Sequence, residues 1–600
     1  MAFTHRWRMA LAIVSTVIAG LAQIVIPGLI GQAVDHAQGL LGDAAVATAQ
    51  VRAALWQTAW LLVAAAAVRG VSTMTQNYQG EAVGHLIAHE MRLAYYRKLQ
   101  RLSFSWHDRV HTGELMTRGI LDIEGTRLWV HTGILRMVLL LVLIGGGSAY
   151  LVDVDPVVGA LALAFVPFVG VGATVARLKL RRLWFALQEE LGVLTRVMEE
   201  NLGGIRVVRA FAAQGFEMAR FDVISRRALG IAHRRIAVFV KSTTTMTYAF
   251  FLSMTLVLWV GGERVIAGHI TVGELTAILA FMTILQQPVR QIAWMVNSIA
   301  RASTCGGRLF EILDLEPAIR DAPGARPLEA PVGVLRFENV SFSYHAPADG
   351  PPAGTADAEV PATLAGVSFE VGPGKVLGIV GPPGSGKSTI AHLIPRFYDV
   401  TAGTITIDGT DIREVTLDSL RAAVSVIQQD AFLFSSAIEA NVAYADPWAD
   451  RSAIRQATET AQLHQYVSQL PDGYGTLVGE RGVSLSGGQR QRLAIARGIL
   501  PQSRVIVFDD SMAAVDAGTE RRIREELAEF TGSRATIIIA HRLSSLRHAD
   551  EILFLEAGRV VERGDHAALI ASGGRYAELH ALQTDPLGHT VGPGTQERES

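Results

Sequence analysis

The first three hundred residues contain long, nearly uncharged apolar runs that predict membrane-spanning helices. Each run is long enough to cross the ~30 Å hydrocarbon core of a bilayer as a helix. The runs lie at about 9–30, 55–74, 131–152, 156–175, 243–262 and 270–299. Because basic residues precede the first run, it could alone be a cleaved signal peptide, but it is too long for one and five further runs follow. We therefore expect a six-helix transmembrane domain over residues 1–315.

Basic residues are distributed unequally among the polar segments between these runs. The segments after the second and fourth runs are rich in Arg and Lys, whereas the other loops hold only Arg52 and Arg264. Positive charge favours the cytoplasmic side of a membrane. This asymmetry predicts a cytoplasmic N-terminus and, after an even number of spans, a cytoplasmic C-terminal half.

The two long basic segments predict helices that continue past the membrane. Proline is absent from 55–155 and from 168–287, and apolar residues recur three and four positions apart. Each segment has a glycine-containing break, at 104–118 and at 200–211, which predicts a helical tip. Independent soluble inserts are the alternative, but the unbroken helical pattern argues against them.

Composition changes after the last apolar run. Residues 316–333 are rich in Pro, Ala and Gly and predict a linker; strands and helices then alternate over 334–583, and 584–600 predict a flexible tail. Residues 345–361 predict a mobile loop. The net charge of −2 gives no support for nucleic-acid binding, and Cys305 is the one cysteine, so no intramolecular disulfide or cysteine-based metal cluster can form.

One stretch of this second half carries a phosphate-binding pattern. An apolar run, 376–380, precedes it and a helical run follows, which is the strand–loop–helix context that the pattern needs. Its residues are Gly381, Pro382, Pro383, Gly384, Ser385, Gly386, Lys387, Ser388 and Thr389. Backbone N–H groups of such a loop cradle phosphate oxygens, while the lysine reaches the β- and γ-phosphates and the serine ligates Mg²⁺. The alternative is a Gly-rich turn that matches by chance.

Further polar residues follow short apolar runs downstream. Gln429 follows 424–427, Asp509 and Asp510 end the run that begins at Val505, and His541 ends 537–540. A carboxylate at the end of such a strand is placed to meet Mg²⁺. Leu485-Ser-Gly-Gly-Gln489 precedes a helix and offers N–H groups to an anion. Tyr344 is a candidate to stack on a base, although a lone strand aromatic is the plainer interpretation.

Together these motifs resemble the ATP-binding cassette (ABC) transporters, in the exporter type that fuses six spans to one nucleotide-binding domain. The resemblance covers essentially the whole chain. It implies a multidomain fold in which an all-α six-helix transmembrane domain with long cytoplasmic extensions precedes an α/β P-loop domain. Residues 112–115 and 204–208 resemble the two coupling-helix regions, and 478–482 resembles the segment that touches such helices.

The resemblance also implies which residues bind ATP and Mg²⁺. Around the chain's own Walker A loop the nucleotide would contact Tyr344 and residues 381–389. Toward a partner's ATP the contacts would be Leu485, Ser486, Gly487, Gly488, Gln489 and Asp516. Mg²⁺ would be held by Ser388, Gln429 and Asp509, and catalysis would involve Asp510, His541 and Gln429. Each ATP would lie between the Walker A loop (381–388) of one chain and the signature motif (485–489) of another. The resemblance therefore implies a dimer.

Asp510 departs from the family pattern, which usually has glutamate at this position. The glutamate orients or deprotonates the attacking water, and the aspartate carboxylate is one methylene shorter. We therefore expect slow or absent hydrolysis at this chain's own Walker site, while the intact signature completes a competent partner site. This combination resembles the degenerate-site subunit of heterodimeric bacterial multidrug or lipid exporters. A homodimer with two equivalent slow sites is the alternative.

The remaining expectations follow from the resemblance. They are a multi-pass protein of the bacterial inner membrane, a second half-transporter as partner, and an amphipathic lipid or drug-like substrate moved by alternating access. Two other classes of protein are alternatives. One is a soluble ATPase of the same cassette family, against which the six spans argue. The other is an ATP-gated importer or regulatory membrane protein, which Asp510 supports. An anionic substrate would fit Arg136 if that residue faces the cavity.

Overall fold

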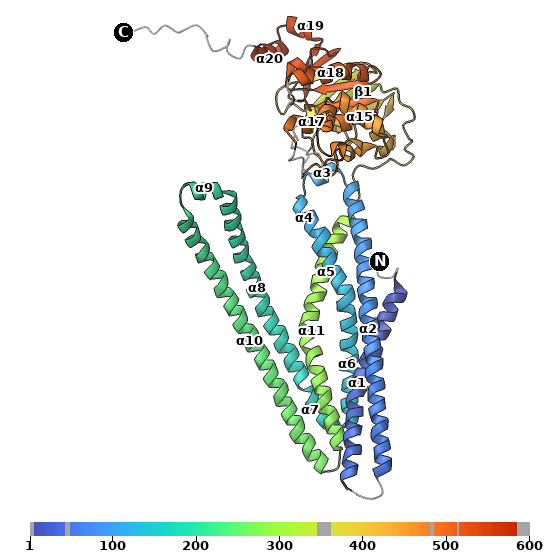
Figure 1. Cartoon of the computed structure of the whole chain (residues 1–600), viewed down its shortest axis with the longest axis vertical. Helices are drawn as coiled ribbons and strands as arrows, with labels where there is room; N and C mark the ends of the chain where they lie inside the picture. The colour runs from blue at the N-terminus through green and yellow to red at the C-terminus, as the bar shows by residue number, and fades with distance from the viewer. Residues whose placement is uncertain are drawn as a thin grey trace, which may run out of the picture. The chain divides into compact units, whose positions relative to one another are not determined.

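The computed structural model describes residues 5–42, 48–344, 362–479, 485–512, 515 and 517–584. The chain forms two compact units, one of Met1–Gln100 with Thr112–Leu315 and one of Arg101–His111 with Glu316–Ser600. Figure 1 traces both units. The loop predicted at 345–361 and residues 585–600 of the predicted tail lie outside the described residues.

The first unit is built from helices alone in the part that the structure describes. It contains α1 (Arg6–Gly42), α2 (Thr48–Arg101), α4 (Thr112–Thr117), η1 (Arg118–Asp122), α5 (Ile123–Leu128), η2 (Trp129–Gly133), α6 (Ile134–Val154), α7 (Pro156–Leu163), α8 (Phe165–Gly203), α9 (Ile205–Ala210), α10 (Gln214–Ile266) and α11 (Val272–Leu313). The short helix α9 joins α8 to α10, and these two long helices lie side by side (Figure 1).

Six of the described helical segments are long and apolar enough to cross a membrane. They are Arg6–Gln38, Arg52–Arg101, Thr112–Val154, Pro156–Gly203, Gln214–Ile266 and Val272–Val289. Several run far beyond the bilayer's needs: α2 has 54 residues and α10 has 53, against the roughly 20 that span the hydrocarbon core. The predicted six-span helical domain is confirmed, and the chain is a multi-pass membrane protein.

The third of these segments is longer than its apolar run predicts. It begins at Thr112 rather than near residue 131, and it contains two π-helical stretches, η1 and η2. Gly119 of η1 lies against the ring of Tyr95, where an added Cβ would come within 2.9 Å of a ring carbon. The Tyr95 hydroxyl donates to the carbonyl of Leu115 at 2.9 Å. This close approach fixes α2 against the start of the third segment.

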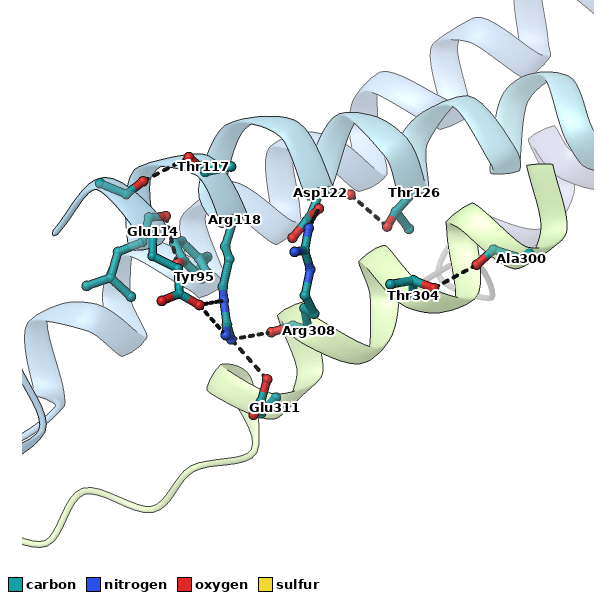
Figure 2. Close-up of polar contacts among 12 residues, drawn as sticks. Tyr95, Glu114, Thr117, Arg118, Asp122, Thr126, Ala300, Thr304, Arg308 and Glu311 are labelled. Atoms are coloured by element: carbon teal, nitrogen blue, oxygen red, sulfur yellow. Dashed lines mark hydrogen bonds and ion pairs between the residues drawn. The ribbon is translucent and has the colours of Figure 1, made fainter. Parts of the chain in front are cut away.

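Figure 2 shows a polar network that fastens the end of α11 to the start of the third segment. Arg118 pairs with Glu114 at 2.7 Å and with Glu311 of α11 at 3.0 Å. Arg308 of α11 pairs with Asp122, whose side chain is only 3% exposed. A lone buried carboxylate would be costly, so Asp122 needs this cation. Cys305 of α11 is buried beside the same segment, and its burial raises the pKa of the thiol.

Polar contacts also join the helices at the opposite ends of the spans. Gly273 at the start of α11 donates its N–H to Asp35 of α1 at 2.7 Å, and a Cβ on Gly273 would lie 2.1 Å from the carbonyl oxygen of Gly31. Only glycine permits this crossing. Asp155 caps α7 and pairs with Arg264 of α10 at 2.7 Å.

The second unit contains two sheets. An antiparallel sheet has the order β2–β1–β4–β5, and a mainly parallel sheet has the order β10–β9–β3–β8–β7–β6. The strands are β1 (Leu335–Phe342), β2 (Leu364–Val371), β3 (Val376–Val380), β4 (Ala402–Ile407), β5 (Thr410–Asp411), β6 (Val424–Ile427), β7 (Val505–Asp509), β8 (Ala535–Ile539), β9 (Glu551–Glu556) and β10 (Arg559–Gly564). Apolar residues of both sheets share one core, which includes Phe337, Ile379 and Val507.

Helices surround these sheets and complete the α/β domain. They are α3 (Phe104–His107), α12 (Lys387–Leu393), α13 (Leu417–Ala423), α14 (Ile438–Val442), η3 (Ala443–Ala445), α15 (Arg451–Thr460), α16 (His464–Ser468), η4 (Gly473–Gly475), α17 (Gly487–Ile499), α18 (Ala517–Thr531), η6 (Leu543–Ser545), α19 (His566–Ala571) and α20 (Arg575–Thr584). A second core contains apolar residues of the helices from α14 through α18, which pack with Ile506 and Phe508 of β7. The predicted α/β fold class is confirmed.

The segment predicted as a linker is irregular but anchored to this domain. Asp408, in the turn between β4 and β5, accepts hydrogen bonds from the backbone N–H groups of Val332, Gly333 and Val334 at 2.8–3.1 Å. Asp321 accepts from the N–H of Leu417 at 2.8 Å. These bonds hold both ends of the segment on the α/β domain.

Candidate nucleotide-binding site

The predicted phosphate loop lies between β3 and α12. Gly381, Gly384 and Gly386 have φ angles of 156°, 77° and 97°, which favour glycine. A Cβ on Gly381 would lie 2.0 Å from the carbonyl oxygen of Leu555, so the loop has no room for a side chain there. This glycine-shaped turn before a helix is the cradle that a chain of phosphates requires.

Lys387 crosses this loop and holds its shape. Its ammonium donates to the carbonyls of Gly381 and Pro382, each at 2.9 Å, and the residue is buried. Burial lowers the pKa of Lys387, while Asp509 and Asp510 raise it in part. The ammonium therefore lies inside the curve of the loop, where it can meet phosphate oxygens.

Ser388 and Asp509 form the pair of oxygen donors predicted for Mg²⁺. The Ser388 hydroxyl donates to the Asp509 carboxylate at 3.0 Å, and Asp509 is buried at the end of β7. Burial raises the pKa of Asp509, and the bond from Ser388 opposes that rise. A hydroxyl and a carboxylate side by side suit a hard cation such as Mg²⁺, so these residues fit the metal.

The structure brings Asp510, Gln429 and His541 together at the edge of the parallel sheet. The Gln429 amide donates to Oδ2 of Asp510 at 3.5 Å, and the backbone N–H of His541 donates to its Oδ1 at 3.3 Å. Asp510 itself has a φ of 44°, in the left-handed region. The three residues come from separate stretches of sequence and meet because β6, β7 and β8 are parallel neighbours.

Tyr344 follows β1 and lies near the phosphate-loop helix. Its hydroxyl donates to the Thr389 side chain at 3.2 Å, and its ring packs edge-on against Phe342 and Tyr398. Burial raises the pKa of Tyr344. A base-stacking role for this ring stays a prediction.

The predicted signature forms the start of α17. Ser486 caps this helix: its side chain accepts from the N–H of Gln489 at 3.3 Å, and Gln489 accepts from the N–H of Ser486 at 2.8 Å. This capping box fixes the glycines of the first turn, Gly487 and Gly488, while Leu485 is buried beneath it. Asp516 and residues 480–484 lie outside the described residues.

The first predicted helical tip contributes contacts that the sequence did not reveal. The ring of Phe104 in α3 lies 4.4 Å from that of Phe397, and Tyr398 donates to Asp108 at 2.6 Å. Tyr398 in turn touches Tyr344. The helix that packs on the α/β domain is thus 104–107, whereas residues 112–115, which resemble the coupling region, begin α4.

Comparisons with known proteins show the family to which the chain belongs. The chain matches the family model described as the ABC transporter transmembrane region over residues 9–289, and the model described as ABC transporter over residues 364–513. The chain belongs to the ABC transporter family and is an exporter half, with one transmembrane domain and one nucleotide-binding domain. Proteins of this type work as dimers in a lipid bilayer and couple ATP hydrolysis to transport.

Individual relatives and a solved structure extend the match to most of the chain. An ATP-dependent lipid A-core flippase of Chromohalobacter salexigens is 34% identical, with 86% of this chain and 87% of that protein covered. A multidrug efflux ATP-binding/permease protein of Mycobacterium bovis is 36% identical over 90% of this chain and 44% of that protein. A bacterial Atm1-family ABC exporter with ATP bound has a TM-score of 0.75 at 28% identity, covering 96% of this chain and 98% of that one.

Proposed function

We propose that this chain is one half of a heterodimeric ABC exporter whose own Walker site hydrolyses ATP slowly. The observation that carries the proposal is Asp510, which occupies the position where the family usually has glutamate. Its two carboxylate oxygens accept hydrogen bonds from Gln429 and from the His541 backbone. A shorter carboxylate whose oxygens already accept two hydrogen bonds is a poor general base. A well-placed general base typically contributes a factor of about 10²–10⁴ in rate.

The remaining site residues take the roles that their positions support. The loop 381–389 would cradle the phosphates, Lys387 would neutralise their charge, and Tyr344 would stack on the adenine. Ser388, Asp509 and Gln429 would hold Mg²⁺, which supplies charge stabilisation to the phosphates when bound. His541 would contact the terminal phosphate, and Leu485–Gln489 with Asp516 would complete the partner's site.

Alternating access is the transport mechanism that this organisation supports. ATP bound by two cassettes would draw them together, and α3, packed on Phe397 and Tyr398, would carry that movement to the long helices. Hydrolysis at the partner's Walker site would reset the transporter. ATP retained at the Asp510 site would keep the cassettes partly in contact.

The membrane placement and the substrate class complete the proposal. The basic segments support a cassette on the cytoplasmic side of a bacterial inner membrane. The proposed transmembrane domain is 1–315, the linker 316–333 and the cassette 334–583. The similarity to a lipid A-core flippase and a multidrug efflux protein supports an amphipathic lipid or drug-like substrate. Arg136, exposed within the third segment and stacked 5.0 Å from the Trp294 ring centroid, could receive an anionic group.

The test is the vanadate-sensitive ATPase activity of the reconstituted chain, alone and co-expressed with the ABC half-transporter encoded beside it. We expect a nearly inactive lone chain, an active pair, and a gain of activity in the lone chain on Asp510→Glu. An ordinary hydrolysis rate for the lone wild-type dimer would instead establish a homodimer with a competent aspartate. ATP-dependent flux in inverted vesicles separates a pump from an ATP-gated importer or regulatory protein.

A further inference from the structure

The last described helix, α20, places a glutamine on the backbone of His541, the first residue of a segment, 541–546, that we call the switch segment. The side-chain amide of Gln583 donates from Nε2 to the carbonyl oxygen of His541 at 2.8 Å. Its Oε1 accepts from the backbone N–H of Leu543 at 2.9 Å. One side chain thus bonds the chain on both sides of Arg542, to residues that lie 42 and 40 positions earlier in the sequence. Gln583 also lies beyond residues 364–513, the stretch that matches the family model.

Packing and capping hold α20 in the place that makes these two bonds. Tyr576 of α20 is fully buried in a core that also contains Leu543 and Leu546 of the switch segment. The Tyr576 hydroxyl bonds to His566 at 2.8 Å, and Glu562 accepts from the N–H of Tyr576 at 3.0 Å. The helix is therefore fixed at its start, and Gln583 reaches the switch segment from a rigid support.

The same segment is held on its opposite flank by the hydrolysis site. The N–H of His541 donates to Asp510, so the histidine's backbone lies between the Asp510 carboxylate and the Gln583 amide. Ser545, further along, donates to the buried carboxylate of Glu520 at 2.5 Å. Side chains from the end of β7, from α18 and from α20 thereby hold the backbone between His541 and Ser545.

We propose that Gln583 is a positioning residue for ATP hydrolysis, which acts by fixing the backbone of His541. The inference rests on the proposed function in one respect, the switch role of His541, which is its contact with the terminal phosphate. A glutamine amide suits the task because it donates and accepts at once, and the switch segment presents one carbonyl and one N–H to it. A glutamate at 583 would keep the acceptor for Leu543 but would set a carboxylate against the carbonyl of His541.

Hydrogen exchange tests the contact directly, without any need for hydrolysis. In the full-length reconstituted dimer, we expect Gln583→Ala to speed exchange of the Leu543 amide by about tenfold, because its hydrogen bond is lost. Gln583→Glu should retain the protection of Leu543. Glu578→Gln, on the same helix but away from the switch segment, should leave exchange unchanged. Equal exchange in the wild-type and Gln583→Ala proteins would overturn the proposal.

Kinetics then test whether the contact acts through the histidine. In an Asp510→Glu background, we expect Gln583→Ala and Gln583→Glu each to lower kcat by about tenfold with the KM for ATP within about twofold of the parent. Adding Gln583→Ala to His541→Ala should cause no further loss, whereas a full additional loss would exclude action through His541.

The two proposals fail in different ways. If the wild-type chain hydrolyses ATP at an ordinary rate, the Asp510 proposal fails, and the same Gln583 series is measured with Asp510 in place. If His541→Ala leaves kcat unchanged, the histidine has no switch role and the positioning proposal is overturned, whatever the exchange data show.

Discussion

The hydroxyl of Tyr398 donates a 2.6 Å hydrogen bond to the carboxylate of Asp108, although 290 residues separate them in the sequence. Burial and the Asp108 carboxylate raise the pKa of Tyr398, so the hydroxyl remains a donor throughout the physiological range. Because Tyr398 also touches Tyr344, this contact connects a helical tip to the nucleotide site.

Tyr398→Phe should therefore weaken coupling rather than ATP binding. The phenylalanine keeps the ring packing against Phe104 but loses a solvent-exposed hydrogen bond, which contributes about 0.5–1.5 kcal/mol. We expect ATP-driven transport in proteoliposomes to fall about threefold to tenfold, with the affinity for an ATP analogue unchanged. Asp108→Asn serves as the reciprocal variant, and a loss of analogue binding in either variant would contradict a coupling role.

Gly381→Ala should abolish the phosphate cradle. The new methyl group would lie 2.0 Å from the carbonyl oxygen of Leu555, and the backbone shift that relieves this overlap costs about 1–3 kcal/mol. We expect at least about tenfold weaker binding of a fluorescent ATP analogue. Gly372→Ala is the matched control, because no atom lies within 4 Å of its added Cβ. Equal binding by both variants would show that the loop tolerates a side chain.

Asp408→Ala should release the linker from the cassette. Three backbone N–H groups lose their acceptor, and partial hydration should limit the loss to about 1–3 kcal/mol. We expect a lower midpoint for thermal unfolding of the cassette and a reduced transport-to-ATPase ratio in proteoliposomes. Asp418→Ala, an exposed aspartate on α13, is the control. An unchanged ratio would mean that the anchor serves stability alone.

The stability of the protein should depend on Asp155 and, through its carboxyl group, on pH. Burial raises the pKa of Asp155, but the N–H groups of Val158 and Val157 and the Arg264 guanidinium together lower it below its usual value. Its contribution to stability is therefore present above the unfolded-state pKa of about 4 and is lost as the pH falls through the lower folded-state pKa.

Variants of Asp155 separate its two roles. Asp155→Asn keeps an oxygen for the helix cap and should cost less stability than Asp155→Ala, which also loses the cap, worth about 1 kcal/mol. Thermal unfolding in detergent at pH 7 gives the order of stability, and repeating it from pH 5 down to about pH 2 tests the acid loss. Identical stability of the two variants would exclude a capping role.

Much of the nucleotide site could be predicted because it depends on local sequence and on parallel strands. The phosphate loop is one continuous stretch, and Ser388 lies near Asp509 because β3 and β7 both flank β8 with their carboxyl ends at one edge. The convergence of Gln429, Asp510 and His541 has the same origin. The sequence therefore indicated the residue types and their places at the ends of apolar runs, while the strand order of the sheet shows that they meet.

The contacts that escaped prediction join segments far apart in sequence through residues with no motif. Tyr398 follows a turn, Asp408 lies in one, and Gln583 lies on a short helix of mixed character. The pairing of Arg118 and Asp122, near the start of the third segment, with Glu311 and Arg308 of α11 also escaped prediction, because no motif marks it. Hydropathy alone reports the apolar part of such a helix.

The single thiol of Cys305 offers a built-in reporter of conformational change. It is buried between α11 and the glycine face of α5, where an added Cβ on Gly125 would come within 2.8 Å of the sulfur, and its raised pKa keeps it protonated. A maleimide can react only when α11 separates from α5. The labelling rate of the unmodified chain should therefore report how often the two helices separate. Because the chain has no other cysteine, no second thiol would react with the maleimide.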